Sequence, residues 1–135
     1  MRVVLDTNVF ISGIFWQGNA CAAIIEAWKN KGFTLVFSHA MLEEFVRVLR
    51  SFKIQMDEKL IEEWQQMIIE NSIIVEPVNK LDIVPFDPSD NKFFEAAVAG
   101  NAQYIVSQDR HLLQIQKYQN IQVLTLPEFL QKLRE

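Results

Sequence analysis

Two aspartates in this sequence each follow a short apolar run of the kind that forms a buried strand. Asp6 comes directly after "VVL", and Asp109 comes soon after "YIV". In a parallel sheet flanked by helices, ligands bind beyond the carboxyl ends of the strands, near the point where the strand order reverses. Two acids at that edge could hold a divalent cation. Each acid can equally be a turn or helix-cap residue, Asp109 for the short helical stretch 110–115.

The adjacent acids Glu43 and Glu44 fall on one predicted helix but differ in their neighbours. Glu43 has Arg47 four residues later, an ion pair typical of a solvent-facing surface. Glu44 has Met41 and Val48 three and four residues away, so it lies at the edge of the apolar face. An acid turned inward needs a metal, a distant arginine or protonation, because an unpaired buried charge is costly. We predict a functional role for Glu44 and a surface role for Glu43.

The segment "FDPSDN" contributes two further acids. Asp87 precedes Pro88, which suits a helix cap followed by proline in the first turn. Asp90 lies three residues later, where a carboxylate can serve a capping box or the helix dipole. Asn91 could hydrogen-bond within a site or cap the helix. These residues alone favour a cap for Asp87 and leave the role of Asp90 open.

The elements that must position these acids alternate along the chain. Strands separated by helices predict an α/β fold, a parallel sheet with helices on its faces. The predicted strands cover 2–6, 33–38, 72–77, 103–107 and 121–125, and the predicted helices cover 19–32, 39–52, 58–71, 87–100 and 127–134. At the ends of these helices we expect Gly32 and Gly100 as C-terminal caps, Ser38 and Asp57 as N-terminal caps, and Pro127 at the first position of the last helix.

The stretch "FISGIFWQGNA" at 10–20 is predicted to be a mobile loop beside Asp6, because it contains Ser12, Gly13 and Gly18. Trp16 lies within it. We expect this side chain to pack against the core or a second subunit, or to stack on a nucleic-acid base.

The composition predicts a single globular domain over residues 1–135. Half of the residues are apolar, glycine and proline are scarce, and the net charge is −4. These values exclude a disordered or collagenous chain and a protein that coats nucleic acid by bulk charge. They leave room for an enzyme that meets nucleic acid at a local site.

The single cysteine and the distribution of apolar residues indicate a cytoplasmic protein. Cys21 has no partner for an internal disulfide, which suits a reducing compartment, and its apolar surroundings predict a core position. We find no run of about 18 apolar residues that could span a bilayer. An acid at position 6 interrupts any export signal.

Three segments together resemble the successive motifs of PIN-domain proteins, particularly the bacterial toxin components of toxin–antitoxin systems that are related to VapC. They are "VVLDTNVFIS", "FSHAMLEEFVRVL" and "PFDPSDNKFFEAAVAGNAQYIVSQDRHLL". The resemblance implies a three-layer α/β/α fold with a five-stranded parallel sheet. It also implies that acids bind Mg²⁺ or Mn²⁺, and the positions that match the family's acids are Asp6, Glu44, Asp90 and Asp109.

The resemblance further implies a ribonuclease, since such proteins typically cut RNA. Gathered carboxylates repel one another, so we expect at least one raised pKa in the metal-free protein. A divalent cation would relieve that repulsion, activate a water and stabilise charge on the leaving oxygen. Lys92 and Arg110 could contact phosphates or be ordinary solvated charges. The candidates for a supporting role at the site are Thr7, Asn8, Asn91, Ser107 and His111.

The sequence departs from the family at one place. Many relatives carry another aspartate two residues after the fourth acid, with a glycine before that acid, whereas this chain has His111 and Gln108 at those positions. Histidine can bind softer divalent ions than Mg²⁺, contact a phosphate, or lie on the surface. The change weakens the expectation of a second metal site but not of the first.

Three functions therefore stay open. The first is a metal-dependent endoribonuclease, acting as the toxin of a toxin–antitoxin pair with a cognate antitoxin, and dimeric by analogy. The second is a catalytically inactive RNA- or protein-interaction module with His111 marking a decayed site. The third is a phosphatase of the haloacid-dehalogenase type, which requires a second aspartate where this chain has Asn8. The sequence does not specify the RNA target.

Overall fold

The computed structural model describes residues 1–51, 53–85 and 87–135. Across these residues, six strands form one sheet in the order β3-β2-β1-β4-β6-β5. The parallel strands are β1 (Arg2–Leu5), β2 (Thr34–Ser38), β3 (Ser72–Val75), β4 (Tyr104–Val106) and β6 (Ile121–Leu124). The predicted α/β fold with five parallel strands is confirmed, and the sheet gains a short antiparallel edge strand, β5 (Lys117–Tyr118).

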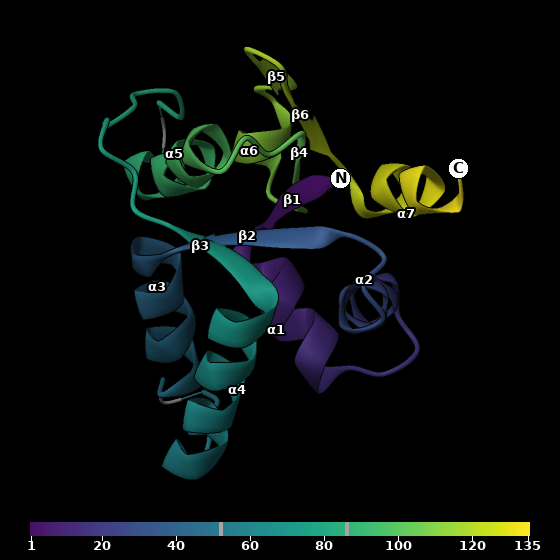
Figure 1. Ribbon diagram of the computed structural model, residues 1–135. Coiled ribbons are helices and arrows are strands. Elements are labelled where there is room, and N and C mark those ends of the chain that lie inside the picture. The colour runs from purple at the N-terminus through teal and green to yellow at the C-terminus, as the bar shows by residue number, and fades with distance from the viewer. Residues whose placement is uncertain (52, 86) are drawn as a thin grey trace.

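Helices cover both faces of this sheet (Figure 1). One face carries the helices that connect β1 to β2 and β2 to β3, and the other carries α5, as the right-handed crossover rule requires when the strand order reverses at β1. The helices are α1 (Thr7–Phe15), α2 (Ala20–Lys29), α3 (His39–Leu49), α4 (Glu58–Asn71), α5 (Asn91–Ala99), α6 (Arg110–Leu113) and α7 (Leu126–Arg134), with a 3₁₀ turn η1 (Pro88–Asp90) before α5.

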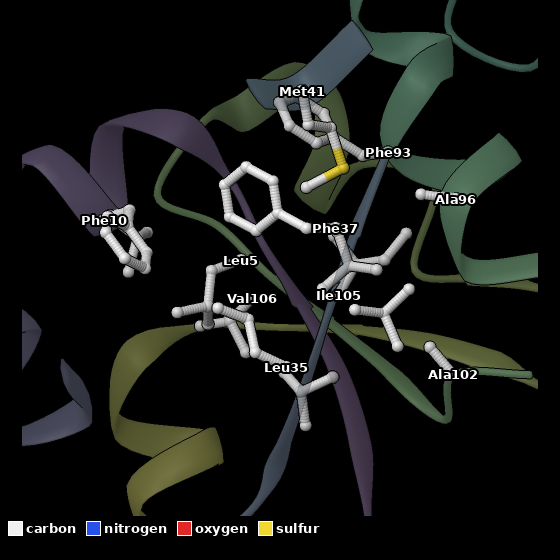
Figure 2. Close-up of a cluster of buried hydrophobic side chains, with 14 of the residues drawn as sticks. Leu5, Phe10, Leu35, Phe37, Met41, Phe93, Ala96, Ala102, Ile105 and Val106 are labelled. Atoms are coloured by element: carbon white, nitrogen blue, oxygen red, sulfur yellow. The ribbon is translucent and has the colours of Figure 1, made fainter. Parts of the chain in front are cut away.

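The core lies between these layers and fixes the central strands. Figure 2 shows Leu5 of β1 and Val106 of β4 between Phe10 of α1 on one side and Phe93 of α5 on the other. All four side chains are at most 1% exposed. The ends of β1 and β4 are therefore held side by side by the core. This packing also fixes the positions of the residues that follow the two strands.

The predicted loop at 10–20 is wrong for most of its length, because α1 extends from Thr7 to Phe15. Gly13 does not loosen this helix; it lets α1 approach α2. A Cβ atom added at Gly13 would lie 2.2 Å from Cγ1 of Ile25 and 2.8 Å from the carbonyl oxygen of Cys21. Only the short connection 16–19 separates the two helices.

Two predicted helix caps are confirmed, since Ser38 caps α3 and Gly100 is the C-cap of α5. Helix α7 begins at Leu126, so Pro127 is the second residue of its helix and not the first. The C-cap of α2 is Asn30 and the left-handed residue after it is Lys31, with φ 62°, so the predicted cap at Gly32 lies two residues too late. The amide of Gly32 instead donates 2.7 Å to the carbonyl of Ala27.

Asp57 is the N-cap of α4 but its side chain makes no capping hydrogen bond. The predicted helix 39–52 ends at Leu49, and its last residue, Phe52, lies outside the described residues, as does Phe86 of the "FDPSDN" segment. In the described parts of the chain, no single helix could cross a membrane by length and composition, and α1 and α2 meet that test only as a pair bent by 91°.

Candidate active site

Asp6 lies at the junction of β1 and α1. Its amide donates 2.9 Å to the carbonyl of Val106, which extends the pairing of β1 with β4 by one residue. Its side chain is the N-cap of α1, accepting from the amide of Asn8 at 3.4 Å, and the residue is 6% exposed. Asp6 is therefore a helix cap, one of the roles that the sequence left open, and its carboxylate also lies at the carboxyl edge of the sheet, where a cation could bind.

Ser107 joins Asp6 to Asp109. Its hydroxyl group donates to Oδ2 of Asp6 at 2.7 Å and accepts from the amide of Asp109 at 2.9 Å. The serine is fully buried directly after β4. One hydroxyl group therefore bonds the carboxylate of Asp6 and the backbone amide of Asp109, two residues that lie 103 positions apart in the sequence. All three residues lie at the carboxyl edge of adjacent strands.

Burial raises the pKa of Asp6, and the nearby charges of Asp109 and Glu44 raise it further. The hydrogen bonds from Ser107 and from the amide of Asn8 act in the opposite direction. Asp109 is a third exposed and caps α6, accepting from the amide of His111 at 2.8 Å. Asp6, Asp109 and Glu44 therefore lie near enough for their charges to affect one another.

Glu44 reaches this edge from α3 and makes two contacts. The hydroxyl group of Thr7 donates to Oε1 of Glu44, and the ammonium group of Lys92 lies 2.6 Å from Oε2. Glu43, its neighbour, is exposed as predicted. The compensation that Glu44 needs is supplied by a distant lysine in this structure.

Asp90 ends the 3₁₀ turn η1 and is the most strongly perturbed acid. Burial raises its pKa to about 7, with further contributions from the charges of Asp87, Asp6 and Asp109, while Lys92 lowers it. The residue is 9% exposed, makes no side-chain capping bond, and its Oδ2 atom has no hydrogen-bond partner. A buried carboxylate oxygen without a partner is costly unless it binds something.

A second group of donors adjoins these acids. One ligand atom from each of Asp87, Asp109 and His111 lies within 4.8 Å of the others. Asp87 makes no cap bond from its side chain but accepts from the hydroxyl group of Ser89 at 2.6 Å, and this bond lowers its pKa. Asp87 therefore holds the predicted N-cap position before Pro88, but its side chain makes no capping hydrogen bond to the 3₁₀ turn η1.

The remaining predicted residues have different positions. The Oδ1 atom of Asn91 accepts from the amides of Ile83 and Val84, so it fixes the segment before η1, and the N-cap of α5 is Asp90 instead. Arg110 and Asn8 are exposed. The backbone amide of Asn8 donates a hydrogen bond to the carboxylate of Asp6.

Trp16, at the end of α1, is 64% exposed. It therefore does not pack into the core of this chain, which was one of the alternatives for it.

The donors suit a hard divalent cation. Asp6, Glu44, Asp90 and Asp109 offer only oxygen atoms, which Mg²⁺ and Mn²⁺ prefer over nitrogen or sulfur. The unpartnered oxygen of Asp90 and the raised pKa values of Asp6 and Asp90 are the features that a bound cation would remove. The group of Asp87, Asp109 and His111 adds a nitrogen donor at the same edge.

Two features of the site escaped the sequence analysis. Asp87 belongs to the donor group, and the spacing of three residues to Asp90 across a 3₁₀ turn is the signal that could have indicated it. The pairing of Lys92 with Glu44 joins helices α5 and α3, and no spacing rule within one helix could have predicted it.

Comparisons with known proteins agree with this geometry. Residues 2–111 match the family model described as "PIN domain". A chain of the "Crystal structure of VapBC2 from Rickettsia felis bound to a DNA fragment from their promoter" superposes with a TM-score of 0.60, covering 93% of this chain and 98% of that chain at 17% identity. At that identity the likeness concerns the fold. No curated protein matches the sequence.

Proposed function

The chain belongs to the PIN-domain family, and from this premise we propose that it is a metal-dependent endoribonuclease that hydrolyses phosphodiester bonds in RNA. The observation that carries the proposal is the buried carboxyl group of Asp90, whose Oδ2 atom has no hydrogen-bond partner and whose pKa is raised to about 7 by burial and by the neighbouring acids. A buried acid with an unsatisfied oxygen lowers the stability of the folded protein. Acids with strongly raised pKa values are concentrated at functional sites.

The proposed ligands of Mg²⁺ or Mn²⁺ are Asp6, Glu44, Asp90 and Asp109. When bound, the cation would activate a water for attack on phosphorus and offset charge on the departing oxygen. Ser107 keeps Asp6 and Asp109 in register, since its hydroxyl group bonds both. Thr7 orients Glu44. Asp90 must release its proton before it can serve as an anionic ligand, because its pKa is about 7.

We propose RNA as the substrate class because the chain belongs to the PIN-domain family and because its acids are gathered at one edge of the sheet. The chain carries a net charge of −4, so attraction to phosphates must come from a cation at the acids and from nearby basic side chains such as the exposed Arg110.

We also propose that the protein is the toxin of a toxin–antitoxin pair. A structurally similar chain comes from a VapBC2 complex bound to promoter DNA, which supports an antitoxin as partner. The exposed Phe15 and Trp16 at the end of α1 suit a protein–protein contact, with either an antitoxin or a second copy in a dimer. A buried, unpaired Cys21 and an RNA substrate suit the cytoplasm. Residues 1–135 would act as a single domain.

The test is cleavage of a panel of structured and single-stranded RNAs with Mg²⁺ or Mn²⁺. We expect cleavage by the wild-type chain, none in EDTA, and a loss of at least about a hundredfold in Asp6→Asn, because a ligand and a fixed charge are removed together. The neighbouring acids of α3 provide a matched pair: Glu44→Gln should lose activity and the exposed Glu43→Gln should retain it. An intact panel with both metals contradicts the proposal.

A second candidate function keeps the fold without catalysis, and His111 in place of an acid is the observation that favours it. Thermal melts separate the two. A ligand that binds only the native state at a hundred times its dissociation constant stabilises by about 2.7 kcal/mol. An increase in Tm with Mn²⁺ that disappears in Asp6→Asn and Asp109→Asn favours the enzyme, and an unchanged Tm favours the interaction module.

A further inference from the structure

Lys92 places a positive charge inside the cluster of acids. Its side chain is 13% exposed, and its ammonium group lies 2.6 Å from Oε2 of Glu44 and 2.6 Å from the carbonyl oxygen of Ser89. Lysine is rarely buried to this degree unless it is paired. The charge of Lys92 also lowers the pKa of Asp90 and of Asp87, so it acts on the acids of η1 as well as on Glu44.

Glu44 has both carboxylate oxygens engaged in this structure. Oε1 accepts from the hydroxyl group of Thr7, and Oε2 faces the ammonium group of Lys92. The glutamate side chain is 21% exposed, so water screens the pair only in part. A divalent cation that takes Oε2 as a ligand would lie next to the positively charged ammonium group, and the repulsion between the two charges favours displacement of the lysine.

We propose that Lys92 is an internal counter-ion that holds Glu44 in the metal-free protein and competes with the divalent cation for its carboxylate. This inference rests on the proposed function, because it concerns the same acids. The ammonium group of lysine is a point charge on a flexible four-carbon stem, so it can leave Glu44 without movement of α5. The carbonyl oxygen of Ser89 gives it a second partner on its own side of the pair.

Competition has two consequences that a passive ion pair lacks. Removal of the lysine charge should tighten cation binding, because Glu44 becomes free and a repulsive charge disappears. That gain should also depend on Glu44: where Oε2 carries no charge, the lysine has nothing to compete for. A lysine that only repels the cation through space would weaken binding equally with either residue at position 44.

The experiment is calorimetric titration of Mn²⁺ into the metal-free, full-length chain, with wild type, Lys92→Met, Glu44→Gln and the double variant. We expect Lys92→Met to bind Mn²⁺ about tenfold more tightly than wild type. In the Glu44→Gln background the same change should alter the affinity by less than about twofold. Lys29→Met removes one equivalent charge from the exposed surface of α2 and should leave the affinity unchanged.

Each outcome decides the matter. Unchanged or weaker Mn²⁺ binding by Lys92→Met overturns the inference, as does an equal gain in both backgrounds, which would indicate simple repulsion. If circular dichroism shows that Lys92→Met is unfolded, Lys92→Gln replaces it in the double-mutant cycle with Glu44→Gln. Failure of the wild-type chain to bind Mn²⁺ overturns the proposed function and this inference together, whereas wild-type binding with no effect of Lys92 overturns the inference alone.

Discussion

At the scale of single residues, Asp90 predicts how the stability of the protein changes with pH. Its pKa rises from 3.8 to about 7 on folding, so between these values the native state holds a proton that the unfolded state has released. The free energy of unfolding of the metal-free protein should therefore fall as pH rises through this window, and level off above about 7. From pH 5 to 8 the loss should be about 2–3 kcal/mol.

Urea unfolding in EDTA at pH 5 and pH 8 measures this dependence, and Asp90→Asn isolates it. The variant cannot ionise at position 90, so the difference in stability between variant and wild type should grow in favour of the variant as pH rises. A difference that is independent of pH contradicts the assigned pKa. The pKa of Asp6 is also raised, mainly by burial, so it contributes a loss of stability in the same direction in both proteins.

His111 predicts a preference between metals. One of its ring nitrogens belongs to the donor group with Asp87 and Asp109, and Mn²⁺ accepts nitrogen ligands more readily than Mg²⁺ does. His111→Ala should therefore weaken Mn²⁺ binding by about three- to tenfold and leave Mg²⁺ binding within about twofold. Parallel titrations with the two ions provide the measurement, and equal losses for both would assign the histidine a purely electrostatic or structural role.

The sequence indicated the residues of the site better than their partners. Asp6 and Asp109 could be found because Asp6 directly follows a strand and Asp109 follows another strand within three residues, and parallel topology brings those strand ends together. The lysine that pairs with Glu44 lies 48 positions further along the chain. Periodicity compares residues on one helix only, so it could not identify a lysine on another helix as the partner of Glu44, and Lys92 was predicted to be a surface residue or a phosphate contact.

At the scale of elements, the packing of α1 on α2 depends on Gly13. We expect Gly13→Ala to lower the free energy of unfolding by about 1–3 kcal/mol, because the added methyl group would overlap Cγ1 of Ile25 and the carbonyl oxygen of Cys21. Since α1 begins at Asp6, a shift of this helix would also displace the carboxylate, and cation affinity should fall with stability.

Gly18 provides the control for this prediction. A Cβ atom there would meet no atom within 4 Å, but φ is +80°, so Gly18→Ala should cost about 1 kcal/mol through backbone strain alone. Ile25→Ala should offset part of the cost of Gly13→Ala in a double variant and none of the cost of Gly18→Ala. Equal coupling of Ile25 to both glycines would contradict a steric role for Gly13.

The loop predicted at 10–20 was wrong because tertiary packing stabilises α1 against its low helix propensity. Glycine, serine and β-branched residues within 9–14 have low helix propensity, which favours a loop reading. In the structure, burial of Val9 and Phe10 stabilises the helix, and the side chain of Asp6 caps its first turn by accepting from the amide of Asn8. The edge strand β5 was missed for a related reason: two residues pair with β6 after the left-handed Gln116, and a strand this short has no periodicity to detect.

At the scale of the whole molecule, the acids and the net charge of −4 oppose any bulk attraction to RNA. A cavity of about 710 Å³ near Trp28 and Phe33 lies at the amino ends of β2 and β3, away from the acids. Volume alone therefore does not identify the proposed RNA site. The distribution of charge is the better guide: in EDTA the carboxylates would repel phosphate, and a divalent cation bound among them would reduce that repulsion and offer phosphate oxygens a ligand position.

Binding of RNA should accordingly require a divalent cation even when no cleavage takes place. We expect the anisotropy of a short fluorescent single-stranded RNA to stay unchanged on titration with the protein in EDTA, and to rise with Ca²⁺, which takes the same oxygen ligands. Asp6→Asn should lose most of this increase, whereas the exposed Glu43→Gln should keep it. Equal binding in EDTA and Ca²⁺ would mean that a basic surface away from the acids holds the RNA, and affinity would then fall steeply with monovalent salt.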